Sequence, residues 1–319
     1  MFCSKIHLKH SGKDFPLRTP TYDTSFQSIE NLQPAESHPC DLPIVGVHVF
    51  EKAGTQSNYP IASIDEAGSV TVWNVFKVTE DSAVWDIGLR PNGRIRMKQI
   101  AIVSVERTAM SIATRDHRIF TTSTVRAQHE QLLIGTSSGY IFKIARNKEC
   151  DREGPRVIDT GMRMTASITT MRISPYDSSV FMVGLSNGHI SLHQLTMSDP
   201  ILSLVVLDRM PLPVTSAEWS PGNPGIIYSF HGGIRLVTWN LEVGREPISS
   251  LDISNPVGSP IVSTRAWSEL SASGSRTSSV SYLAFATTKG IVQRHLMNDS
   301  RTSKVSSFKD IIQSILKKI

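Results

Sequence analysis

The strongest constraint on the fold is a short hairpin pattern that recurs along the chain. Each copy has a brief apolar strand, a tight turn that contains glycine, and a second strand in which apolar and polar residues alternate. Glycine reaches positive φ without steric cost, and a period of two is typical of a half-buried strand. The pattern therefore predicts a series of antiparallel hairpins. Their turn glycines are Gly68, Gly139, Gly188, Gly233 and Gly290.

Further strands flank several of these hairpins. Residues 168–175 (ITTMRISP) and 214–221 (VTSAEWSP) match almost position for position, and 44–50 (IVGVHVF) is a third copy without the Ser-Pro ending. Proline ends such a strand because it has no N–H to donate to a ladder. Another apolar strand, near 201–208, follows the third hairpin. The repeating unit is therefore predicted to have four strands.

The hairpins end in Trp73-Asn74, His193-Gln194 and Trp239-Asn240, where a WD-repeat blade carries Trp-Asp. Together with the order of strands, this pattern resembles the WD-repeat β-propeller family. The resemblance implies an all-β fold with about five recognisable blades. Asn or Gln stands in the Asp position and no Gly-His dipeptide opens the units, which puts the usual His–Ser–Trp–Asp hydrogen-bond network in question.

The length sets a second expectation. A blade takes about 40–45 residues, so 319 residues would accommodate about seven blades. Only five are recognised, so we expect that the chain is truncated or comes from an incomplete gene model. We therefore expect an incomplete seven-bladed propeller that forms an open, C-shaped ring. Two further blades within 1–43 and 86–120 would contradict this. The predicted division is a Pro-rich irregular start (1–43), in which the remnant of an upstream blade is one interpretation, then propeller blades (44–300), then a basic amphipathic helix (301–319).

Three stretches depart from the repeat. Residues 86–120 are interpreted as outer strands of a blade plus a loop, and the Ser-rich residues 268–281 as a flexible surface loop. Residues 308–319 (FKDIIQSILKKI) place apolar side chains at helical spacing, which predicts a helix with one apolar face. That helix could pack on the propeller, bind a partner, or lie on a membrane surface, and the sequence leaves all three open.

Composition excludes several classes of protein. Cys3, Cys40 and Cys150 are odd in number and far apart, which argues against a disulfide framework and a Cys-rich zinc site. The N-terminus lacks the apolar run of a signal peptide, and the apolar stretch at 201–207 is too short to span a membrane. A reduced, intracellular, soluble protein is expected. The net charge of +5 gathers in 86–120 and 301–319 without interleaved aromatic residues, so no nucleic-acid partner is predicted.

No pattern of catalytic, cofactor-binding or metal-binding residues is found, and neither an enzyme nor a cofactor is predicted. His189 and His193 have metal-like spacing, but four residues of a strand span about 13 Å, too far for one ion. His193 is instead expected to replace the blade tryptophan in packing. Asp65, Glu66 and Asp86 are expected to be exposed turn or loop acids, because nothing pairs them with a base.

The order of segments points to a narrower family. Residues 17–22 (LRTPTY), 61–73 (IASIDEAGSVTVW) and 86–95 (DIGLRPNGRI) are similar to consecutive pieces of the C-terminal WD-repeat region of the dynein-2 (intraflagellar transport) intermediate chains. Residues 183–195 and 214–221 resemble later blades of that family. The 86–95 stretch distinguishes this family best from other WD-repeat proteins, because it is not a general feature of WD repeats. The resemblance extends from about residue 17 to the end of the chain.

This resemblance implies a non-catalytic scaffold subunit that binds the dynein-2 heavy chain and supports retrograde intraflagellar transport and cilium assembly. A second dynein-2 intermediate chain and dynein light chains are implied partners, the light chains through an N-terminal arm that we do not expect within this sequence. The implied location is the cytoplasm, the cilium, the ciliary base and the cytoskeleton, without membrane insertion. Motifs assign no residue to heavy-chain contacts. A WD-repeat adaptor of another assembly, such as a transport train or a ubiquitin-ligase receptor, is the alternative.

Overall fold

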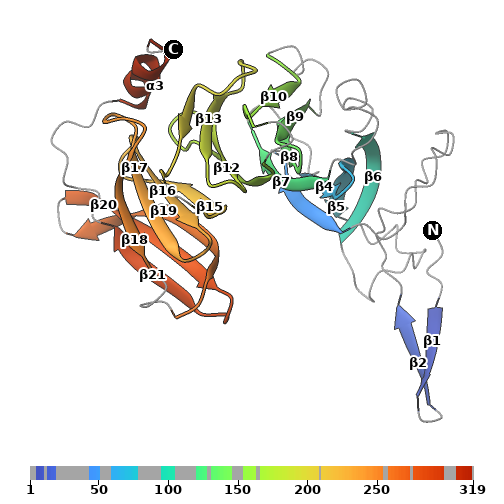
Figure 1. Ribbon diagram of the computed structural model, residues 1–319. Helices are drawn as coiled ribbons and strands as arrows, with labels where there is room; N and C mark the ends of the chain where they lie inside the picture. The colour runs from blue at the N-terminus through green and yellow to red at the C-terminus, as the bar shows by residue number, and fades with distance from the viewer. Residues whose placement is uncertain are drawn as a thin grey trace. The chain divides into compact units, whose positions relative to one another are not determined.

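In the part of the chain that it describes, the computed structural model consists mainly of antiparallel β-strands, with one helix near the C-terminus (Figure 1). The chain divides into two compact units, Met1–Arg115 and Asp116–Ile319, and each is described by itself. The structure describes residues 5–10, 13–18, 43–50, 59–77, 95–104, 120–127, 131–145, 154–162, 166–207, 210–253, 258–273, 276–297 and 307–317.

The first unit holds a two-stranded hairpin and one four-stranded sheet. The hairpin pairs β1 (Lys5–His10) with β2 (Lys13–Arg18). The sheet, which we call blade 1, pairs its strands in chain order. It consists of β3 (Ile44–Val49), β4 (Tyr59–Asp65), β5 (Ser69–Lys77) and β6 (Ile95–Ser104). Strand β6 confirms that 86–120 contributes an outer strand.

The second unit holds four sheets, blades 2 to 5, each again paired in chain order. Blade 2 comprises β7 (Thr121–Arg126), β8 (Gln131–Thr136), β9 (Tyr140–Ala145) and β10 (Val157–Asp159). Blade 3 comprises β11 (Ile168–Ile173), β12 (Val180–Leu185), β13 (Ile190–Gln194) and β14 (Leu202–Leu204). Blade 4 comprises β15 (Val214–Trp219), β16 (Ile226–His231), β17 (Arg235–Asn240) and β18 (Pro247–Asp252). Blade 5 has three strands, β19 (Ile261–Ser273), β20 (Arg276–Thr287) and β21 (Val292–Met297).

Consecutive blades of the second unit meet through their first strands. Strand β7 lies against β11, β11 against β15, and β15 against β19. In all five blades the first strand has a register irregularity near its start, for example between Ile168 and Thr170 and between Val214 and Ser216. The repeated bulge shows that the five sheets are copies of one unit, including blade 2, whose first strand the sequence pattern did not reveal.

The turn glycines are required by both conformation and space. Gly188 has φ of 85°, and a Cβ there would lie 2.7 Å from the carbonyl oxygen of Leu212. Gly233 has φ of 70°, and its Cβ would lie 2.6 Å from the carbonyl oxygen of Ile261. A side chain at either position would therefore be strained and would clash with the backbone that leads into the next blade. This explains why glycine marks the hairpins so clearly.

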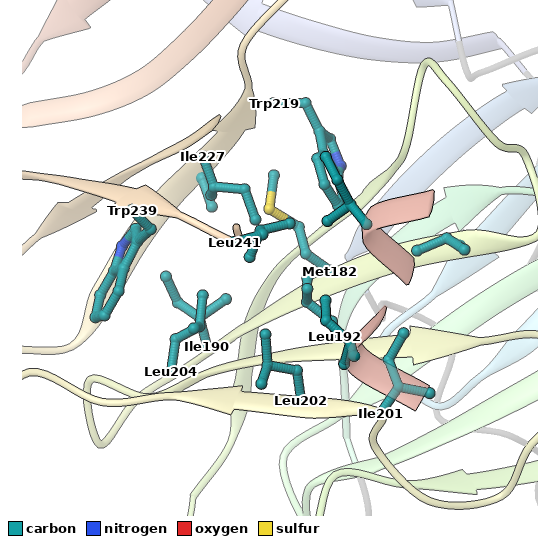
Figure 2. Packing of buried hydrophobic residues seen from close by; sticks show 14 of the residues in the cluster. Met182, Ile190, Leu192, Ile201, Leu202, Leu204, Trp219, Ile227, Trp239 and Leu241 are labelled. Carbon is teal, nitrogen blue, oxygen red and sulfur yellow. The ribbon is translucent and has the colours of Figure 1, made fainter. Parts of the chain in front are cut away.

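The core of the second unit lies between its blades. The largest cluster joins blades 3 and 4 around Met182, Leu192, Trp219 and Trp239, and Figure 2 shows these side chains facing one another. A second cluster joins blades 2 and 3. A third joins blades 4 and 5 around Phe230. Burial between sheets, with each strand alternating its side chains between two faces, is how stacked blades are stabilised.

One predicted segment is wrong. The described residues of 268–281 do not form a flexible surface loop, because β19 and β20 pair without interruption from Ser268↔Ser281 to Ser273↔Arg276. Serine in a strand still supplies a backbone N–H and C=O, so a Ser-rich composition does not prevent ladder formation. The five blade sheets among the described residues agree with the five predicted hairpins, and the described parts of 1–43 and 86–120 hold the β1–β2 hairpin and β6. The open ring stays a prediction.

Candidate interaction surfaces

A row of charged residues crosses the first strands of blades 3, 4 and 5. Arg172, Glu218 and Arg265 each lie four residues after the start of β11, β15 and β19. The Arg172 Nε donates to Glu218 Oε1 at 3.1 Å. Burial raises the pKa of the Glu218 carboxyl, and Arg172 and Arg265 oppose that rise. Removal of Arg172 would leave the buried Glu218 carboxylate with less compensation, which is costly inside a protein.

Further hydrogen bonds cross the same boundaries. The hydroxyls of Ser216 and Thr264 lie 2.5 Å apart and join blade 4 to blade 5. The Trp219 indole N–H donates to the Arg172 carbonyl oxygen at 3.3 Å, and the Tyr176 hydroxyl donates to the Ser220 carbonyl oxygen at 2.6 Å. Blades 3, 4 and 5 are thus connected by polar contacts as well as apolar ones, which suits a rigid platform.

Part of the WD-type hydrogen-bond network is present, which settles the question raised by the sequence. In blade 4 the Trp239 indole N–H donates to Ser229 Oγ at 2.8 Å, and Ser229 Oγ lies 2.9 Å from His231 Nε2. In blade 1 the Trp73 indole donates to Ser63 Oγ at 3.0 Å with the same ten-residue separation. The serine and histidine come from the second strand of the blade, so the network forms without an Asp after the tryptophan.

His193 takes the tryptophan position in blade 3, as predicted. Its ring is fully buried, stacks on Phe181 with centroids 5.2 Å apart, and lies 2.8 Å through Nε2 from Ser191 Oγ. Burial lowers the pKa of His193 to about 3, and burial lowers the pKa of His231 in blade 4 to about 4. Both rings are therefore neutral at physiological pH.

Helix α3 (Phe308–Leu316) packs on the propeller, which answers the question that the sequence left open. Phe308, Ile311, Ile312 and Ile315 are buried in the cluster between blades 3 and 4. The Phe308 ring meets Trp219 edge-on with centroids 5.6 Å apart, and it stacks on Tyr176 at 5.7 Å. The apolar face of the helix is thus occupied within the chain.

The structure describes only some of the acids and other residues singled out in the sequence. Asp65 accepts the backbone N–H of Ser69 at 2.8 Å and so shapes the hairpin turn. Among the described residues no group of three His, Cys, Asp or Glu could hold a metal ion. Asp86 and the three cysteines lie outside the described residues. No helix among the described residues is long and apolar enough to cross a membrane.

These sheets, their repeated bulge and the Trp–Ser contacts identify the five sheets as blades of a WD-type β-propeller. Solved structures agree on the fold: Raptor from Chaetomium thermophilum aligns with a TM-score of 0.51 and 10% identity, over 82% of this chain and 20% of that chain. An active polycomb repressive complex 2 in the basal state aligns with a TM-score of 0.50 and 10% identity, over 76% of this chain and 48% of that chain. No protein-family profile matches the chain.

Curated sequences confirm the narrower resemblance. The chain is 27% identical over 282 residues to cytoplasmic dynein 2 intermediate chain 1 of Mus musculus, covering 77% of this chain and 27% of that protein. It is 26% identical over 262 residues to cytoplasmic dynein 2 intermediate chain 1 of Homo sapiens, covering 75% of this chain and 24% of that protein. The chain is therefore similar to these dynein-2 intermediate chains over about three quarters of its own length, and it spans about a quarter of the length of these relatives.

Proposed function

We propose that the chain is a non-catalytic scaffold subunit of the cytoplasmic dynein-2 motor complex. The observation that carries the proposal is the similarity to dynein-2 intermediate chains over three quarters of the chain. In this role it binds the dynein-2 heavy chain, works beside a second intermediate chain and supports retrograde intraflagellar transport and cilium assembly. Its site of action is the cytoplasm and the cilium, including the ciliary base.

The physical properties of the blades support a scaffold. Inter-blade clusters and the Arg172–Glu218 pair make a stiff body, and a stiff body loses little conformational entropy when a large partner binds. His193 and His231 are buried and neutral, which suits a role in packing within their blades. Fold alone does not define function, so the partner must be tested directly.

Co-precipitation with the tail of the dynein-2 heavy chain tests the proposal. The tagged chain is expressed with that tail, and the tail of the dynein-1 heavy chain serves as the matched control. We expect recovery of the dynein-2 tail only. Recovery of neither tail by a folded chain, or equal recovery of both, contradicts the proposal.

The alternative is an adaptor in another assembly, which the departures from the WD pattern at Asn74, Gln194 and Asn240 favour. Proximity labelling in ciliated cells separates the two roles. A labelled set that contains dynein-2 subunits supports the scaffold. A set rich in transport-train or ubiquitin-ligase subunits without the motor supports the adaptor.

A further inference from the structure

Helix α3 fills a groove between blades 3 and 4. The Phe308 ring lies against two other rings, Tyr176 in the segment between β11 and β12 and Trp219 at the end of β15. One turn later Ile311 reaches blade 4, since a Cβ added at Gly225 would lie 3.4 Å from Ile311 Cδ1. Figure 2 shows Trp219 beside the helix. The groove therefore has identified walls from two consecutive blades.

The aromatic side chains of the groove are positioned by the blades themselves. The Tyr176 hydroxyl donates to the Ser220 carbonyl oxygen, and the Trp219 indole N–H donates to the Arg172 carbonyl oxygen. Each of these two bonds joins blade 3 to blade 4 and involves no atom of the helix. We therefore expect the groove to keep its shape when the helix leaves. A preformed apolar groove needs little ordering when it binds a ligand.

The sequence of α3 is a poor one for an isolated helix. Nine residues are too few for a stable helix in water. Most of them also belong to types that rank below Leu, Lys and Gln in helix propensity. These residues are Phe308, Asp310, Ile311, Ile312, Ser314 and Ile315. Ordering of the segment therefore opposes its docking, and a helix made of better helix formers would bind the same groove more tightly.

The contacts of α3 with the blades come from one apolar face. Its buried residues recur at i, i+3, i+4 and i+7, and they are Phe308, Ile311, Ile312 and Ile315. The residues on the opposite side are exposed, namely Lys309, Asp310, Gln313 and Ser314. Helices of partner proteins enter apolar grooves through a stripe with this spacing. The helix that is seated in the groove thus defines the chemistry of any other helix that could replace it.

We propose that the groove between blades 3 and 4 is a docking site for an amphipathic helix of a partner protein, and that α3 is its displaceable occupant. The partner helix carries an aromatic residue at its first buried position and branched aliphatic residues three, four and seven positions later. It binds as α3 is released, so α3 limits access to the site. The proposal rests on the second unit alone and does not depend on the motor assignment.

Fluorescence anisotropy on the full chain tests the proposal. The probe is a labelled peptide of residues 307–319 with alanine in place of Gln313 and Ser314, which favours the helix without changing its buried face. The variant Phe308→Ala, whose own helix is undocked, should bind the peptide at least about tenfold more tightly than the wild type, because the tethered helix no longer competes. Lys309→Ala, on the exposed side of α3, is the matched control and should bind like the wild type.

Two further changes show whether the peptide occupies the groove. Addition of Tyr176→Ala to the Phe308→Ala chain should remove the gain in affinity, because it takes away one wall of the groove. A peptide with alanine at the position of Phe308 should not bind either chain. Failure of the Phe308→Ala chain to bind the peptide overturns the proposal. Equal binding by the wild type and by Phe308→Ala does so as well, because the peptide would then lie outside the groove.

Hydrogen exchange on the wild-type chain tests displacement directly and does not require a variant to fold. Excess peptide should speed amide exchange in residues 310–316 of the chain, which differ in mass from the peptide, and leave blade 5 unchanged. Unchanged exchange in 310–316 overturns the proposal. So does a dimer in sedimentation that Phe308→Ala abolishes, because a second copy would then supply the helix. Loss of heavy-chain recovery leaves these results unaffected, so the two proposals fail independently.

Discussion

Replacement of Phe308 by alanine should detach helix α3 and measurably destabilise the second unit. Phe308 is only 6% exposed and contacts both Trp219 and Tyr176. Truncation of a buried Phe to Ala costs ~3–5 kcal/mol, through lost burial and the cavity that remains. A helix of nine residues is not stable in water by itself, so it should unfold once undocked. The loss of stability therefore cannot exceed the free energy with which the helix docks on blades 3 and 4.

Urea denaturation followed by tryptophan fluorescence measures this effect, because Trp219 lies under the helix. We expect the free energy of unfolding to fall by about 3 kcal/mol, together with faster tryptic cleavage at Lys309 and Lys317. Lys309→Ala, on the exposed side of the same helix, is the control and should change stability by less than ~0.5 kcal/mol. If Phe308→Ala unfolds like the wild type and its tail stays protected, the helix does not stabilise the fold.

Three further predictions concern the blades. The free energy of unfolding should fall as the pH drops below about 6.5, because His193 and His231 stay neutral in the folded chain but become protonated in the unfolded chain. Each histidine should lower the free energy of unfolding by about 1.4 kcal/mol per pH unit. Ser229→Ala should cost ~1–3 kcal/mol, since it leaves the buried Trp239 indole N–H without an acceptor. Gly184→Ala should cost ~1–3 kcal/mol, since its Cβ would lie 2.6 Å from Val214 Cγ1 at the boundary between blades 3 and 4.

Matched variants test each of these in chemical denaturation. His193→Phe should halve the slope of the free energy of unfolding against pH below about 6.5. An unchanged slope would show that His193 does not contribute to it. Ser249→Ala, on the exposed strand β18, should not change stability. If Ser249→Ala and Ser229→Ala lower stability equally, the contact of Ser229 with the indole does not stabilise the fold. Gly244→Ala should be neutral, because nothing lies within 4 Å of its added Cβ. Tolerance of Gly184→Ala would mean that the blades can separate there.

Local features of the fold could be read from the sequence wherever one residue type meets a strict local demand. Gly188 and Gly233 are such cases, because positive φ and a nearby backbone exclude other residues. The packing role of His193 also followed from its position in the repeat. Residue type gave the wrong prediction for the Ser-rich segment 268–281, because pairing between β19 and β20 depends on backbone groups that every residue has.

The sequence by itself determined the repeat, the strand order within a unit, the amphipathic helix and the similarity to dynein-2 intermediate chains, because each is encoded in residue types at fixed spacing. Only the tertiary structure decided which faces meet. It brought Glu218 to Arg172 from 46 residues away, seated Phe308 on Trp219, and placed Arg265 and Arg294 in one row of blade 5. These pairings arise from strand register and blade stacking, and a linear pattern does not specify either of them.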